Sequence, residues 1–91
     1  MDIKVVIPSQ LRPLAHGAGE VVVNGSNVGD ALEDLERRHP GMRARIMDDH
    51  GAIRRFVNVF VRDEDVRFLE GLQTSLTEGD SLVILPAVAG G

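Results

Sequence analysis

The last two residues of the chain, Gly90 and Gly91, carry the chemistry that can be argued most directly from this sequence. Glycine has no Cβ, so a backbone that ends in two glycines is thin and adopts almost any φ and ψ. Such an end can enter a narrow pocket on another protein and present the α-carboxylate of Gly91 to the chemistry there. An ordinary frayed terminus is the alternative interpretation, since chain ends are commonly poorly ordered.

A carboxylate at this end needs activation before it can take part in acyl transfer. With a pKa of about 3.5 it is ionised at neutral pH, which makes it a poor electrophile. The chain has no cysteine, so any sulfur chemistry in which it takes part cannot use a thiol side chain of its own. The lack of cysteine also fits a reducing, cytoplasmic setting.

The other residues that could do chemistry form no catalytic or metal-binding motif. His16, His39 and His50 lie in separate segments without the spacing of metal ligands. The acidic clusters at 48–49 and 63–65 lack the ligand positions and the central glycine of a calcium loop. We therefore expect no metal site and no intrinsic catalytic residue, and we interpret both acidic clusters as solvated turns.

Composition argues against several classes of protein. The 91 residues carry a formal net charge of −4, whereas nucleic-acid-binding proteins usually present a basic surface. No apolar run approaches the roughly 20 residues that a membrane-spanning helix needs. Met1–Lys4 also lacks the basic-then-apolar pattern of a signal peptide. We expect a cytoplasmic protein with no nucleic-acid or membrane partner.

β-branched and alternating segments predict five strands. The clearest is Phe56–Arg62, where Val57, Val59 and Val61 share one face. The segment Ser9–Gly19 contains a proline and two glycines, which is typical of a loop. The predicted strands are Ile3–Ile7, Glu20–Val23, Phe56–Arg62, a short edge strand at Val66–Leu69, and Ser81–Pro86.

One main helix is predicted after the second strand. Its apolar stripe consists of Val28, Ala31, Leu32 and Leu35. These positions follow the i, i+3, i+4, i+7 spacing of a helix with one buried face. Asn27 is the predicted N-cap, and Pro40–Gly41 ends the helix. Met42–Met47 is expected to form a further short helical turn.

The order strand, strand, helix, strand, short strand, strand predicts a β-grasp fold of the α+β class. One small mixed sheet is covered on one face by the main helix. The first and last strands are expected to lie side by side in its middle. We expect the β-grasp domain at residues 1–86 and a flexible C-terminal Gly-Gly tail at residues 87–91.

Strand alternation also predicts a surface for partners. If the valines of the clearest strand face the helix together with Leu82 and Ile84, then Phe60, Val83 and Leu85 face outward. An exposed apolar patch on a small domain usually marks an interface. The alternatives are a loop folded over this face, or Phe60 as a lone surface aromatic.

Several stretches of the chain carry a family resemblance. They are Ile7–Pro8, Leu11–Pro13, Arg55–Val59, Val61–Phe68, Gly71–Leu72, Gly79–Ser81 and Ile84–Gly91. In these the chain resembles the ubiquitin-like sulfur carriers of the ThiS and MoaD family. The resemblance spans essentially the whole chain, is weakest between residues 17 and 50, and is closest to the actinobacterial carriers of cysteine biosynthesis.

The resemblance implies that Gly91 is the site of covalent sulfur attachment. In this family a partner enzyme uses ATP to adenylate the terminal carboxylate. A sulfur donor then displaces AMP and leaves a thiocarboxylate. The residues implied to thread into the partner are Ala87, Val88, Ala89 and Gly90. The chain itself is implied to bind no cofactor and to be a carrier rather than an enzyme.

Three partners are implied by the resemblance. They are an adenylating and sulfur-loading enzyme of the ubiquitin-activating type, a pyridoxal-phosphate-dependent cysteine synthase or another sulfur-accepting biosynthetic enzyme, and a zinc metallopeptidase that releases the product. Because the chemistry at Gly91 is the same in each pathway, a carrier for molybdopterin, thiamin or thio-sugar biosynthesis is an alternative. A ubiquitin-like modifier attached to protein lysines and a plain binding module with an inert tail are two further alternatives.

Overall fold

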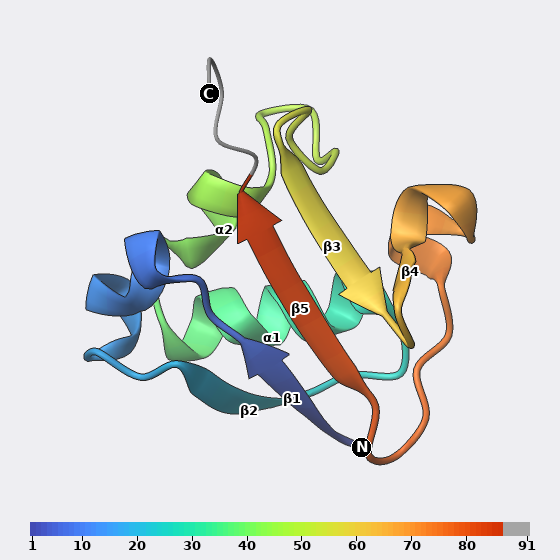
Figure 1. The fold of residues 1–91 in the computed structure, drawn as a ribbon, viewed down its shortest axis with the longest axis horizontal. Helices are drawn as coiled ribbons and strands as arrows, with labels where there is room; N and C mark the ends of the chain where they lie inside the picture. The colour runs from blue at the N-terminus through green and yellow to red at the C-terminus, as the bar shows by residue number, and fades with distance from the viewer. Residues whose placement is uncertain (87–91) are drawn as a thin grey trace.

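A mixed five-stranded sheet with the strand order β2-β1-β5-β3-β4 is the framework of the fold (Figure 1). The computed structural model describes residues 1–86. Residues 87–91, where the tail is predicted, lie outside the described residues. The strands are β1 (Asp2–Val6), β2 (Glu20–Asn24), β3 (Val57–Val61), β4 (Glu64–Asp65) and β5 (Ser81–Pro86).

Two α-helices, α1 (Val28–Arg38) and α2 (Met42–Ile46), lie on one side of this sheet. Short 3-10 helices occupy η1 (Ser9–Ala15), η2 (Val66–Phe68) and η3 (Gly71–Gln73). Within residues 1–86, no helix combines the length and the hydrophobicity needed to cross a membrane.

The first and last strands are neighbours in the middle of the sheet. β1 and β5 run parallel, with Val5 opposite Leu82. β2 pairs antiparallel with the outer side of β1, and β3 pairs antiparallel with the other side of β5. Because a parallel pair cannot be joined by a tight turn, the chain must cross over between these strands, and α1 lies in that crossover. This arrangement confirms the predicted β-grasp fold.

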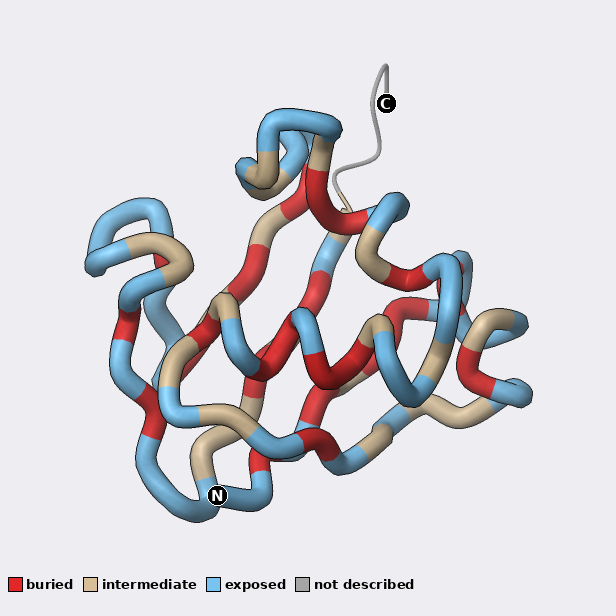
Figure 2. Tube along the Cα trace, turned by 180° about the vertical axis from the view of Figure 1, so that it is seen from behind, coloured by how far each residue is buried: buried red, intermediate tan, exposed pale blue. Residues whose placement is uncertain are grey.

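The core lies between the sheet and α1. Buried positions alternate with exposed or half-buried ones along the long strands, and Figure 2 shows this pattern from the helix side. The predicted inward set is buried throughout: Val57, Val59, Val61, Leu82 and Ile84 from the strands, and Val28, Ala31, Leu32 and Leu35 from the helix. One apolar stripe and one sheet face therefore close the core, and within residues 1–86 no helix covers the other face of the sheet.

The start of α1 follows the prediction. The side-chain oxygen of Asn27 accepts a hydrogen bond of 2.7 Å from the backbone N–H of Asp30, so Asn27 is the N-cap. The helix ends at Arg38, before Pro40–Gly41, as predicted. A capped first turn fixes where α1 begins, and hence which of its residues face the sheet.

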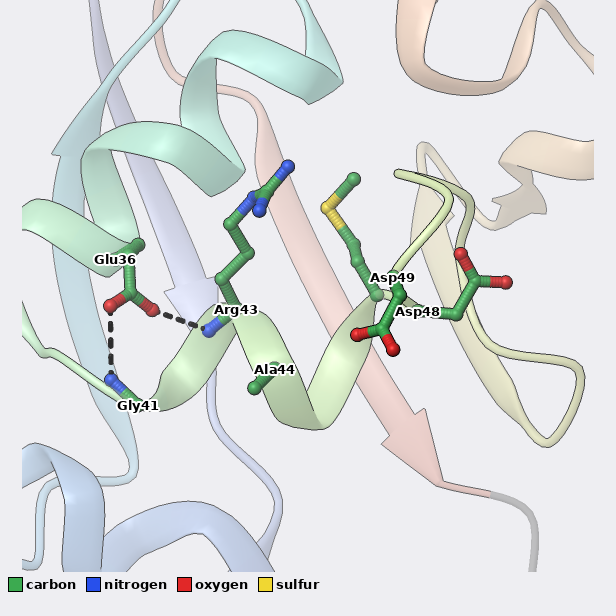
Figure 3. A pocket seen from close by; sticks show the side chains of 7 residues that line it. Glu36, Gly41, Arg43, Ala44, Asp48 and Asp49 are labelled. Carbon is green, nitrogen blue, oxygen red and sulfur yellow. Dashed lines mark hydrogen bonds between the residues drawn. The ribbon is translucent and has the colours of Figure 1, made fainter.

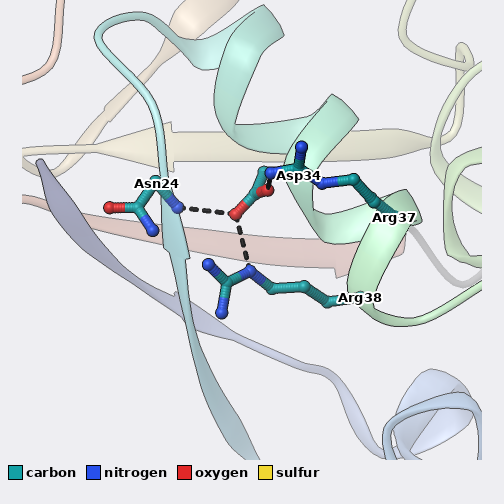
Figure 4. A network of polar contacts seen from close by, with 4 residues as sticks. All are labelled: Asn24, Asp34, Arg37 and Arg38. Carbon is teal, nitrogen blue, oxygen red and sulfur yellow. Dashed lines mark hydrogen bonds and ion pairs between the residues drawn. The ribbon is translucent and has the colours of Figure 1, made fainter.

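A buried carboxylate joins α1 to the end of β2 (Figure 4). Asp34 accepts the backbone N–H of Asn24 at 2.8 Å and Nε of Arg38 at 2.7 Å, and it also pairs with Arg37. The N–H of Asn24, with further help from the two guanidinium groups, lowers the pKa of Asp34 to about 2. Its buried charge is therefore fully hydrogen-bonded, and it ties helix to sheet.

The predicted loop at Ser9–Gly19 is only partly correct, because its first part folds as η1. Leu11 and Ala15 are buried on one side of this turn. In addition, Nε of Arg12 donates to the carbonyl of Ile7 at 3.0 Å. Burial of two apolar side chains four residues apart favours a helical turn, despite the proline inside it.

The predicted edge strand at Val66–Leu69 is wrong. The edge strand is β4, immediately before it, and Val66–Phe68 folds as η2. The carboxylate of Asp65 accepts the backbone N–H of Arg67 at 2.8 Å, which starts the turn. Val66 then enters the core. A local side-chain cap therefore outweighs the β-propensity of one valine.

The Asn27→Ala variant tests the helix cap. It leaves the N–H of Asp30 without its side-chain acceptor, so the free energy of unfolding should fall by about 1 kcal/mol. Urea denaturation measures this change. Asn27→Ser keeps an acceptor oxygen and is the matched control, expected to stay close to the parent. Equal stability of the alanine and serine variants would contradict the capping role.

The Asp34→Asn variant tests the buried carboxylate through pH. The folded pKa of Asp34, about 2, lies below its ordinary value of 3.8. A lowered pKa gives stability that is present above the unfolded pKa and is lost as pH falls through the folded pKa. Melting temperatures measured from pH 6 down to pH 2 should therefore fall less steeply for Asp34→Asn than for the parent. Asp49→Asn, at an exposed loop carboxylate, is the control and should keep the parental slope.

Candidate functional site

The sheet face opposite α1 carries a row of apolar side chains, which we call the open face: Val6, Val22, Phe60, Val83 and Leu85. It is the face turned toward the viewer in Figure 1. Phe60 and Val83 are half-buried, while Leu85 is 47% exposed and Val22 is 52% exposed. The outward orientation predicted for Phe60, Val83 and Leu85 is therefore confirmed, and Leu85 is not covered by a loop of the described chain.

Strand register brings the members of the open face together. Phe60 lies directly opposite Val83 across the antiparallel β3–β5 pair. Val83 in turn lies beside Val6 across the parallel β1–β5 pair. Neighbouring strands are about 4.8 Å apart, so these three side chains form a continuous row across the sheet. Leu85 continues the apolar surface along β5 toward Pro86.

Sequence reasoning missed two members of this surface. Val6 and Val22 belong to β1 and β2, and they share the outer face with Lys4. The alternation of buried Ile3 and Val5 with outward-facing Lys4 in the sequence was the available signal. Placing Val6 next to Val83 also required the parallel register, which a single sequence does not give.

Charged pairs lie around the start of β5, at one end of the open face. Nζ of Lys4 is 4.0 Å from the carboxylate of Glu20. Arg62 pairs with Asp80, whose carboxylate also accepts the N–H of Thr77 at 2.8 Å. The N–H of Thr77, and then Arg62, lower the pKa of Asp80 below its ordinary value. These ion pairs hold the start of β5 in place. The apolar side chains of the open face lie farther along the strand, toward Pro86.

β5 ends at Pro86, and we call this C-terminal end of the strand the β5 end. Pro86 lies opposite Val57 in the sheet. Just before Val57, Phe56 is 53% exposed and the guanidinium of Arg55 lies 5.1 Å from its ring centre. Nε of Arg54 donates to the carbonyl of Ala44 at 2.9 Å. A basic and aromatic surface, formed by Arg54, Arg55 and Phe56, therefore lies beside Pro86, the last described residue.

A surface hollow beside α2 is lined by Glu36, whose carboxylate has a structural role (Figure 3). The carboxylate of Glu36 accepts the backbone N–H groups of Arg43 at 2.8 Å and Gly41 at 3.1 Å. Those two bonds lower the pKa of Glu36. Nε of Arg43 lies 2.7 Å from the carboxylate of Glu33. Because Glu36 holds the start of α2, its oxygens are already engaged by the backbone.

Two of the three histidines come together in the fold. The rings of His16 and His39 lie 6.1 Å apart, centre to centre, although they are far apart in the sequence. Among residues 1–86, no group of three or more histidine, aspartate or glutamate side chains is placed to hold a metal ion. The predicted attachment site Gly91, and the predicted threading residues Ala87, Val88, Ala89 and Gly90, lie outside the described residues.

Comparison with known proteins places this geometry in a family. The ThiS family profile matches residues 5–91. The sulfur carrier protein CysO of Mycobacterium tuberculosis is 47% identical, with 100% of both chains covered. In the Amycolatopsis orientalis BexX/CysO complex, a chain superposes with a TM-score of 0.91 at 45% identity, covering 98% of this chain and 99% of that one. The small archaeal modifier protein 3 of Haloferax volcanii is 37% identical over 70 residues, 77% of this chain and 75% of that protein. This chain belongs to the ThiS family.

Proposed function

We propose that this chain is a sulfur carrier whose Gly91 carboxylate becomes a thiocarboxylate, and that the sulfur goes to cysteine biosynthesis. The observation that carries the proposal is the full-length identity of 47% to a protein named sulfur carrier protein CysO. The superposition on a chain of the BexX/CysO complex supports a carrier that acts together with a partner enzyme.

The proposed chemistry takes place in two steps at one carboxyl group. A carboxylate oxygen of Gly91 attacks the α-phosphorus of ATP, pyrophosphate leaves, and an acyl-adenylate forms. Hydrosulfide supplied by a sulfur donor then attacks the carbonyl carbon, AMP leaves, and the product is a thiocarboxylate. ATP and the groups that stabilise the phosphate charge belong to the partner. The chain is the substrate of these steps, and it binds no cofactor.

The open face gives this proposal an energetic basis. Ordering the five residues 87–91 in a partner's pocket costs about 1–2 kcal/mol per residue, or roughly 5–10 kcal/mol in all. Burying apolar surface returns about 25 cal/mol per Å², so roughly 200–400 Å² of apolar contact would offset that cost. The open face, which includes Phe60, Val83 and Leu85, is the described surface best suited to provide it.

Three partners follow from the proposal. They are a ubiquitin-activating-type enzyme that adenylates and loads the chain, a pyridoxal-phosphate-dependent cysteine synthase that receives the sulfur, and a zinc metallopeptidase that releases the product. The relative from Haloferax volcanii favours a second candidate, a ubiquitin-like modifier joined to protein lysines, at the lower identity of 37%. Carriage of sulfur to molybdopterin, thiamin or thio-sugars would use the same end of the chain.

Loading of the chain is tested by intact mass spectrometry after incubation with ATP, a sulfur source and the activating enzyme. Exchange of one terminal oxygen for sulfur should add about 16 Da, whereas linkage to a protein lysine would give a far heavier adduct. Deletion of Gly91 should abolish the mass gain and leave the melting temperature unchanged. A chain extended beyond Gly91 that gains sulfur without being processed would contradict the proposal.

Docking through the open face is tested with the Leu85→Asp and Val83→Asp variants. A buried charge in the contact should weaken binding to the activating enzyme about tenfold or more, as measured by isothermal titration calorimetry. Circular dichroism and melting curves should show the parental fold for Leu85→Asp, because Leu85 is already 47% exposed.

The matched control for docking is Phe68→Asp. Phe68 is 85% exposed but lies on η2, outside the open face. Its replacement should leave the affinity close to that of the parent. Parental affinity of folded Leu85→Asp, or equal weakening by Phe68→Asp, would remove the open face from the proposal.

A further inference from the structure

Side-chain amines are almost absent from this chain. It contains nine arginines and a single lysine, Lys4. A lysine ammonium can lose a proton and attack an activated acyl group, which gives a stable amide. An arginine guanidinium stays protonated at any working pH. Within this sequence, only Lys4 and the α-amino group of Met1 can therefore form an amide with an activated carboxyl group.

Both amines lie at the start of β5, away from the β5 end. Lys4 is paired with Ser81, the first residue of β5, and the N-terminus lies beside the same end of the strand (Figure 1). Pro86 is five residue steps beyond Ser81, which is about 17 Å along a strand. The five residues after Pro86 can span at most about 17 Å. The Cα of Lys4 is therefore about as far from Pro86 as five extended residues can span, so its amine can meet Gly91 only when those residues lie back along β5.

The cations beside the β5 end are arginines. Arg55 precedes Val57 by two residues, so their Cα atoms are at most about 7 Å apart. Val57 lies opposite Pro86, about 5 Å away across the sheet. A side chain at position 55 is therefore well within the reach of Gly91. Positions 54 and 55 are both exposed.

We propose that this distribution protects the activated carboxyl group of Gly91 from the chain's own amines, an inference that rests on the proposed function. In an acyl-adenylate, an amine would attack the carbonyl carbon, the bond to AMP would break, and the amine proton would pass to solvent. The resulting amide can accept no sulfur. Arg54 and Arg55 supply positive charge beside the β5 end without supplying a nucleophile. Lys4 lies beside the start of β5, away from that end.

The test uses a chain whose Gly91 carries a thioester of a small thiol, made by intein cleavage. In a thioester the amine attacks the same carbon, and the thiol leaves with a proton. In Arg55→Lys at pH 8, the thioester should be lost about tenfold or more faster than in the parent, because a tethered amine has a high effective concentration. The product should be about 18 Da lighter than the hydrolysed chain, and peptide mapping should find the new amide at position 55.

Two control variants separate position from charge. Arg62→Lys adds an amine near the start of β5, where Arg62 pairs with Asp80, and should lose its thioester at the parental rate. Arg55→Gln removes the same guanidinium without adding an amine and should also behave like the parent. Melting curves verify that each variant is folded before its rate is compared.

Three results would overturn the inference. They are a parental rate of thioester loss in folded Arg55→Lys, equally fast amide formation in Arg62→Lys, and rapid amide formation at Lys4 in the parent. Because the thioester is made without an activating enzyme, these outcomes do not depend on whether the chain is adenylated. Failure of enzymatic loading would instead contradict the proposed function and leave this measurement intact.

Discussion

The parallel pairing of β1 with β5 is the constraint on which the rest of the structure depends. It places the last strand in the middle of the sheet, bonded to a neighbour on each side. Leu82 and Ile84 are buried against the helix side, while Val83 and Leu85 face outward from the same strand. The strand that completes the core therefore also carries the centre of the open face. The position of Pro86 relative to that face is fixed by the sheet.

Strong periodicity made most of the fold predictable. The stripe of α1 and the alternation in β3 each repeat over several residues, so one local irregularity does not hide the pattern. The 3-10 helices η1 and η2 were not predicted because each depends on a few local contacts and not on a repeated pattern. Arg12 bonds to the carbonyl of Ile7 in one, and Asp65 caps the other. Segments of seven and three residues contain too little repetition to show such contacts in advance.

The candidate site was predictable to a similar extent. Alternation alone assigned Phe60, Val83 and Leu85 to the outer face, since a strand has only two faces. Their contact with one another, and the addition of Val6, follow from the pairing of strands that are distant in sequence. The role proposed for Gly91 rests on the chemistry of a carboxylate that follows two glycines and on the family resemblance, and it is independent of strand or helix periodicity.

Several acidic side chains in this small protein accept hydrogen bonds from the backbone. Asp34 and Glu36 accept main-chain N–H groups at the end of β2 and the start of α2, and Asp80 does the same in the turn before β5. A carboxylate with several such donors is stabilised in its ionised form. These acids therefore fix turns and helix ends, which explains why an acidic chain without a described metal or catalytic cluster still has several carboxyl groups with lowered pKa values.

The central position of β5 also has a mechanical consequence. A force that grips the chain beyond Pro86 and pulls along the strand loads the β1 and β3 ladders in shear, because β5 is bonded on both sides. All the hydrogen bonds of a ladder in shear bear the load together, whereas an edge strand peeled away from its end loses them one at a time. The domain can therefore resist unfolding by a force applied at its C-terminal side. An enzyme that pulls on this end would have to break the hydrogen bonds of two ladders together.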